Sequence, residues 1–115
     1  MKTANTLWDM EEHFWTRGAD SARHMTAKDA VFVLPYPAGI LQGDAAFREA
    51  DVAQRWRSVE MSERHFTQQD NIAVLVYHAS AERGDVPIYQ ALCTSTYVDD
   101  DGTWLRLTHQ QTPLN

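Results

Sequence analysis

The second half of the chain is a succession of strand-length segments separated by short turns, and this feature limits the fold more than any other. The segments mix β-branched, aromatic and polar residues and cover roughly 58–68, 71–82, 87–98 and 103–112. The stretches "QQDN", "ERGDVP" and "DDDG" separate them, and Asp-Gly is typical of tight hairpins. Connections this short join antiparallel neighbours, because parallel neighbours need crossovers of about a dozen residues or more. The sequence therefore predicts an antiparallel meander.

The first half of the chain begins with the pattern of an amphipathic helix. Apolar residues recur at helical spacing and form a stripe made by Leu7, Met10 and Phe14, with Trp8 and Trp15 beside them. Glu11 and Glu12 fall on the other side, away from the predicted core. Gly18 ends this helix.

Further helices and one short strand follow before the meander. Asp20 can cap a second helix that reaches about residue 25, and "AVFVL" predicts a strand over 30–34. The prolines and the glycine of "PYPAG" predict a loop, and a third helix is expected over 43–56. The resulting fold class is α+β, with three N-terminal helices packed on the concave face of a curved antiparallel sheet.

Length and charge restrict the function. The chain has 115 residues, of which 43% are hydrophobic, so we expect one domain spanning 1–115. Its net charge is -6 and its pI is near 5.2, and the Lys and Arg residues are scattered. Nucleic acid and anionic membranes are therefore not expected as partners.

Membrane insertion, metal binding and disulfide formation are also not expected. The longest apolar run, 72–77, is far shorter than the roughly 20 residues of a spanning helix, and no secretory signal pattern begins the chain, which predicts a cytoplasmic protein. Cys93 is the only cysteine, and the histidines lack ligand spacing. No cofactor or metal is therefore predicted.

The order helix, helix, strand, Pro-x7-Gly, helix and meander resembles the nuclear transport factor 2-like (NTF2-like) superfamily, whose fold ketosteroid isomerase and the SnoaL-like cyclases share. The resemblance rests on "AVFVLPYPAGILQGDAAFRE" at 30–49 and "VDDDG" at 98–102. The ending "WLRLTHQQTP" at 104–113 is more similar to uncharacterised members. This resemblance implies a cone-shaped sheet that encloses a mostly apolar pocket.

The same resemblance implies that the isomerase chemistry is absent. The position of the isomerase's general base holds Leu34, and the position of its second acid holds Thr94. Its oxyanion tyrosine falls near Met10 or Glu11. A leucine cannot accept a proton, and a threonine is only a weak donor.

The resemblance also predicts which side chains point into the cone. Counting from Gly102 selects four residues of the last strand, namely Leu105, Leu107, His109 and Gln111, and four of the preceding strand, namely Gln90, Leu92, Thr94 and Thr96. The predicted pocket residues are Tyr36, Trp56, Gln90, Leu92, Thr94, Leu107, Gln111, Leu34, Met10 and Phe14. His109, which titrates near neutrality when unperturbed, is the candidate catalytic acid or base.

Three functional interpretations follow and stay open at this point. The leading one is a homodimer that binds a small hydrophobic organic molecule in the cone. The alternatives are a SnoaL-like isomerase, cyclase or hydratase that uses His109, and a non-catalytic association domain. The dimer is expected to form through the outer sheet face, which the predicted pattern equips with Tyr89, Cys93, Tyr97, Trp104 and Arg106.

Overall fold

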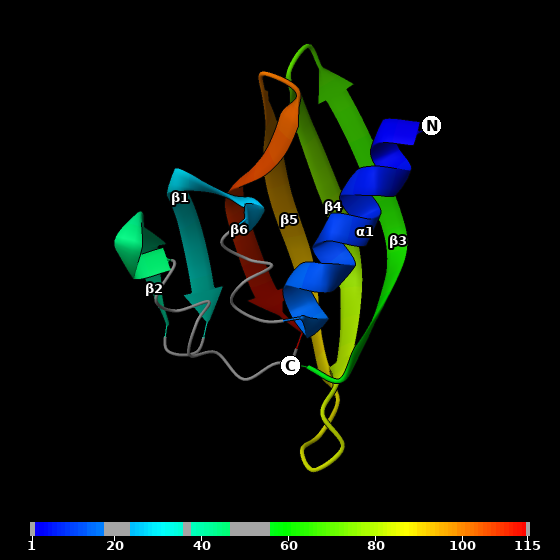
Figure 1. The fold of residues 1–115 in the computed structure, drawn as a ribbon. Coiled ribbons are helices and arrows are strands. Elements are labelled where there is room, and N and C mark those ends of the chain that lie inside the picture. The colour runs from blue at the N-terminus through cyan, green and yellow to red at the C-terminus, as the bar shows by residue number, and fades with distance from the viewer. Residues whose placement is uncertain (1, 18–23, 36–37, 47–55, 115) are drawn as a thin grey trace.

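The structure is a computed structural model that describes residues 2–17, 24–35, 38–46 and 56–114. Its elements are α1 (Lys2–Thr16), β1 (Thr26–Pro35), β2 (Ala38–Gln42), β3 (Ser58–Gln69), β4 (Ile72–Glu82), β5 (Tyr89–Asp100) and β6 (Thr103–Pro113). The strands form one sheet in the order β2-β1-β6-β5-β4-β3, and α1 lies across one of its faces (Figure 1). We call the face that α1 covers the inner face, and the opposite one the outer face.

The predicted meander is confirmed. Strands β3 to β6 follow one another as antiparallel neighbours. Between β5 and β6, Asp101 and Gly102 have φ angles of 54° and 94°. Two successive positive φ angles are those of a type I′ turn, which matches the right-handed twist of the flanking strands.

The expectation of a purely antiparallel sheet is wrong. β1 pairs with β6 in parallel, so the sheet is mixed. The segment 38–42, which had been predicted as loop, folds back on β1 as β2. The chain between β1 and β6 includes most of the domain, so the rule that short connections join antiparallel neighbours does not apply to this pair.

Only part of the predicted helical layer falls within the described residues. That part consists of α1, a helical residue at position 24 and the start of a further helix at residue 44. Most of the predicted second helix, 20–25, and most of the third, 47–55, lie outside the described residues. No helix in the described part of the chain is long and apolar enough to cross a membrane.

α1 packs on the sheet through a row of residues spaced by four. Leu7, Glu11 and Trp15 are buried, and Trp8 joins them. Residues four apart lie on the same side of a helix, so this row faces the sheet. Burying each large apolar side chain contributes about 1.5–3 kcal/mol.

The inner face of β4 and β5 consists of alternate, odd-numbered residues. These buried residues are Ala73, Leu75, Tyr77, Ala79, Ala81, Ala91, Cys93, Ser95 and Tyr97. The predicted orientation of β5 is therefore wrong: Gln90, Leu92, Thr94 and Thr96 belong to the outer face, and Leu92 is 47% exposed. Both alternating sets contain residues that favour strands, so the pattern alone did not specify which face was buried.

A bulge in β6 explains the second error of orientation. Tyr97 pairs with Arg106 whereas Thr96 pairs with Thr108, so Leu107 is an extra residue in β6. The bulge lets Arg106 and His109, three positions apart, both be buried. Arg106 had been predicted on the outer face. Leu107 is only partly buried and packs against the core cluster around Phe32.

The burial of Cys93 gives a direct test of the two faces. Burial, with a contribution from Glu11, raises the pKa of the Cys93 thiol to about 12. We expect the native wild-type protein to react with a thiol reagent such as DTNB only as fast as it unfolds. The variant Gln90→Cys in a Cys93→Ser background carries its thiol on the outer face and should react at the rate of an exposed thiol. Equal rates for both proteins would contradict the assignment of the faces.

Candidate functional site

A buried carboxylate lies at the centre of the inner face. The Glu11 side chain is 0% exposed and accepts four hydrogen bonds from the sheet. Its Oε2 atom accepts from Tyr77 and, at 2.5 Å, from Ser95. Its Oε1 atom accepts from Tyr97 at 2.6 Å and from Arg106 at 3.0 Å. Helix α1 is thus linked to β4, β5 and β6 through a single side chain.

Glu11 and Arg106 are a buried ion pair. Burial disfavours the charged carboxylate, but Arg106, the nearby His109 and the hydrogen bond from Ser95 outweigh it and hold the pKa of Glu11 well below its usual range. Burial also opposes the charge on Arg106, but Tyr97 and Glu11 outweigh it and raise the pKa of Arg106. Both groups are therefore charged at neutral pH.

Aromatic rings cover the rest of the Arg106 guanidinium. Its Cζ atom lies 3.9 Å from the ring centre of Phe14 and 5.0 Å from that of Tyr97, which are cation–π distances. Its Nη2 atom makes the hydrogen bond to Glu11, whereas Nε and Nη1 have no hydrogen-bond partner among the described residues. Removing Glu11 would therefore leave a buried cation without a compensating charge.

His109 lies beside this ion pair. Its Nδ1 atom is 2.7 Å from the Ser95 hydroxyl and 3.5 Å from Oε2 of Glu11. Its Nε2 atom is 3.1 Å from the side-chain nitrogen of Gln111. The rings of Phe14, Trp15 and Phe32 contact the imidazole, with centroid distances of 4.7, 6.2 and 6.1 Å.

The hydrogen bonds determine which nitrogen of His109 carries the proton. Burial lowers the pKa of His109 although Glu11 partly offsets it, so the ring is neutral at pH 7. Ser95 must donate to the ionised Glu11, which can only accept. The Ser95 oxygen then accepts from Nδ1–H of His109, and Nε2 is left with a lone pair that accepts from the Gln111 amide.

Aromatic rings lie at the Gln111 end of this chain of hydrogen bonds, which is the end farther from Glu11. Tyr89 donates to the carboxamide oxygen of Gln111 at 2.9 Å. The Tyr89 and Trp56 rings stack 5.5 Å apart at an interplanar angle of 14°, and Trp15 lies 6.3 and 6.5 Å from them. Arg83 lies over the Trp56 ring, with its Cζ atom 4.4 Å from the ring centre. Trp15 is buried, whereas Trp56, Arg83, Tyr89 and Gln111 are only partly buried.

The structure brings together only some of the predicted site residues. His109, Gln111, Phe14 and Trp56 belong to the assembly just described. Leu34, Leu107 and Met10 are partly buried and pack in the core clusters. Gln90, Leu92 and Thr94 lie on the outer face, and Tyr36 lies outside the described residues. Whether any of them contacts a ligand stays a prediction.

The charged centre of the site was not predicted from the sequence. Glu11 was expected away from the core, Arg106 and Tyr97 were expected on the outer face, and Ser95 and Tyr77 had no predicted role. One signal was present in the sequence. Leu7, Glu11 and Trp15 are spaced by four, so they share one side of the helix, and the apolar residues at both ends of this row predict that Glu11 is buried too.

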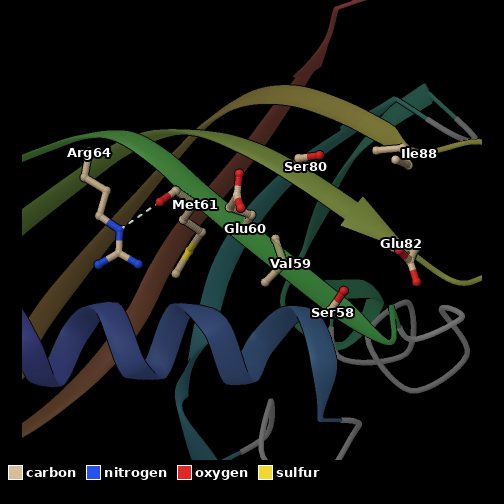
Figure 2. A pocket seen from close by; sticks show the side chains of 8 residues that line it. All are labelled: Ser58, Val59, Glu60, Met61, Arg64, Ser80, Glu82 and Ile88. Carbon is tan, nitrogen blue, oxygen red and sulfur yellow. Dashed lines mark hydrogen bonds between the residues drawn. The ribbon is translucent and has the colours of Figure 1, made fainter.

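The structure also has a groove at the edge of the sheet. It has a volume of about 520 Å³, and its lining residues are Ser58, Val59, Glu60, Met61, Arg64, Ser80, Glu82 and Ile88 (Figure 2). None of the predicted pocket residues lines it. Within the described residues, no group of three or more His, Cys, Asp or Glu side chains could hold a metal ion.

Comparison with known proteins identifies the fold. No protein-family profile matches the sequence, and no significant match is found among curated proteins. An NTF2-like protein from Cytophaga hutchinsonii superposes with a TM-score of 0.80 over 99% of this chain and 100% of its own, at 12% identity. The chain has the NTF2-like fold.

Other solved structures with this fold differ in function. A proposed ketosteroid isomerase from Parabacteroides distasonis has a TM-score of 0.80 and 15% identity over 95% of this chain and 86% of its own. The association domain of CaMKII from C. elegans has a TM-score of 0.75 and 8% identity over 96% and 92%. At such low identity the NTF2-like fold alone is shared, and function must be argued from the site.

Replacing Glu11 by Gln should strongly destabilise the protein. The change removes the negative charge that compensates the buried Arg106, a loss that costs about 3–5 kcal/mol in the free energy of unfolding. Urea unfolding at pH 7 measures it. The matched control is Glu12→Gln, one residue along the same helix but exposed, which should cost about 0.5 kcal/mol or less. Similar losses in both variants would contradict the central role of Glu11.

The pH dependence of stability should carry a contribution from His109. Because folding lowers its pKa from about 6.5, the unfolded chain binds the proton more readily, and stability is lost as the pH falls below about 6.5. The slope for one such group is at most about 1.4 kcal/mol per pH unit. Urea unfolding between pH 7.5 and 5 should show that His109→Gln removes this slope. The exposed control His65→Gln should retain it; retention by both variants would contradict a buried, neutral His109.

Proposed function

We propose that this NTF2-like protein binds a small, largely apolar organic molecule in its cone, with the polar group of that molecule against His109. One observation carries the proposal: the neutral His109 presents the lone pair of Nε2 to the incompletely buried side of the site, where its partner is the Gln111 side chain. The other ring nitrogen, Nδ1, donates its hydrogen to Ser95. A ligand that reaches this end meets a hydrogen-bond acceptor of fixed orientation.

The surroundings of His109 support a ligand that is mostly apolar. Aromatic rings contact the imidazole, and the stacked Trp56 and Tyr89 rings lie beside Trp15. Binding sites for small molecules are typically lined by apolar and aromatic side chains with a few placed polar groups. The two charges nearest to His109, on Glu11 and Arg106, compensate each other. An uncharged ligand therefore suits the site best.

Proton-transfer catalysis at His109 stays a prediction. Nε2 is the atom that would accept a proton, and the link through Ser95 to Glu11 would stabilise the resulting imidazolium. The positions at which the isomerase has its acids do not supply them: Leu34 packs in the core, and Thr94 belongs to the outer face.

The likeness to a CaMKII association domain favours a second candidate, an association domain. The outer face is not covered by a helix in the described residues and exposes Val76 and Leu92 on neighbouring strands. An exposed apolar sheet face supports self-association. This face differs from the predicted one, because Cys93, Tyr97 and Arg106 are buried on the inner side.

Native mass spectrometry of the purified protein tests both candidates. The wild-type protein should carry a non-covalent mass of a small molecule, and folded His109→Ala should retain at least about tenfold less of it, because the variant lacks the acceptor. His65→Ala serves as the control and should retain it. Absence of bound mass in the wild type, or equal retention by His109→Ala, would contradict ligand binding at His109. A monomer at micromolar concentration would contradict the association domain.

A further inference from the structure

We infer that the polar group of the ligand is an uncharged donor–acceptor pair, such as a primary carboxamide or a lactam, and that it takes the place held by the carboxamide of Gln111. The inference rests on the proposed function and names the chemical class of its ligand. It starts from the two hydrogen bonds of Gln111, whose nitrogen donates to His109 and whose oxygen accepts from Tyr89.

The direction of each bond is set from the buried end. Glu11 is ionised and only accepts, so Ser95 donates to it and accepts from Nδ1–H of His109. Nε2 of the neutral ring can then only accept, which places the nitrogen of Gln111 beside it. The carboxamide oxygen is left to accept from Tyr89 at 2.9 Å. The buried carboxylate thus fixes the donor and acceptor positions at the Gln111 end.

A ligand that displaces Gln111 must replace both of these bonds. It must donate to Nε2 of His109 and accept from the Tyr89 hydroxyl, since a buried polar group left unpaired lowers affinity. A primary amide and the edge of a lactam carry an N–H and a C=O side by side, as Gln111 does. An ester or a ketone lacks the donor, and an N,N-disubstituted amide, such as an N-alkylated lactam, has lost it.

Charge excludes ionised versions of the same groups. A carboxylate would turn an acceptor toward the lone pair of Nε2 and would add a second negative charge near Glu11, which lies 3.5 Å from the other ring nitrogen. An ammonium could donate to Nε2 but not accept from Tyr89. Burial of either charge without a partner is also costly. The flat Trp56 and Tyr89 rings favour a planar group beside them.

A rescue experiment tests this inference with two probes that differ in one N–H. The variant Gln111→Ala removes the internal carboxamide, and NMR titration measures its affinity for 2-pyrrolidinone and for N-methyl-2-pyrrolidinone. We expect the lactam with the free N–H to bind at least about tenfold more tightly, because only it can donate to His109. The additional change His109→Phe should abolish this difference.

Gln110→Ala is the matched control, since Gln110 is the exposed neighbour of Gln111 on the same strand and its loss opens no space beside His109. Gln111→Ser replaces the alanine variant if that variant does not fold. Equal affinity of Gln111→Ala for the two probes would overturn the inferred ligand class and leave small-molecule binding intact. If neither probe binds while the wild type retains a His109-dependent ligand in native mass spectra, the inferred ligand class is overturned and the proposed function stands. If the wild type retains no such ligand either, both proposals fail.

Discussion

The ion pair between Glu11 and Arg106 is the interaction on which the rest of this structure depends. Both side chains are fully buried, and each compensates the charge of the other. The carboxylate is the point where helix α1 meets three strands, and its four hydrogen bonds use both of its oxygens. An apolar residue at this position could pack, but it would leave Arg106 charged and unpaired.

This ion pair also determines the chemistry of the site. Because Glu11 can only accept, the hydrogen bonds run in one direction, from Gln111 through His109 and Ser95 to the carboxylate. A neutral histidine with a defined tautomer results, and it offers an acceptor rather than a charge. The fold is shared with proteins of different function, so the function of this chain must be argued from these polar residues and not from its shape.

The sequence allowed the meander and the first helix to be predicted because both depend on local signals. Turn residues bound the strands, and an Asp-Gly pair closes the last hairpin. The parallel pairing of β1 with β6 depends on contacts between distant segments, which local patterns do not report. The orientation of β5 failed for a different reason: Leu92 and Thr94 are as compatible with a strand as Cys93 and Ser95, and a one-residue shift exchanges the two faces.

Half of the site could be predicted, and the half that could not is the charged one. His109 and Gln111 were placed correctly on the inner face because they follow the bulge. Arg106 precedes it, and the extra residue Leu107 reversed its expected orientation. Glu11 was assigned to solvent because carboxylates are rarely buried unless they are paired, and its partner lies 95 residues away.

The 15N NMR spectrum of the His109 ring at pH 7 tests the direction of the hydrogen bonds that run from Gln111 to Glu11. Long-range correlations from the ring protons distinguish a protonated nitrogen from one with a lone pair. We expect a neutral ring with the proton on Nδ1 and a lone pair on Nε2. A ring protonated on Nε2 alone, or on both nitrogens, would contradict the direction of hydrogen bonding that the buried Glu11 imposes.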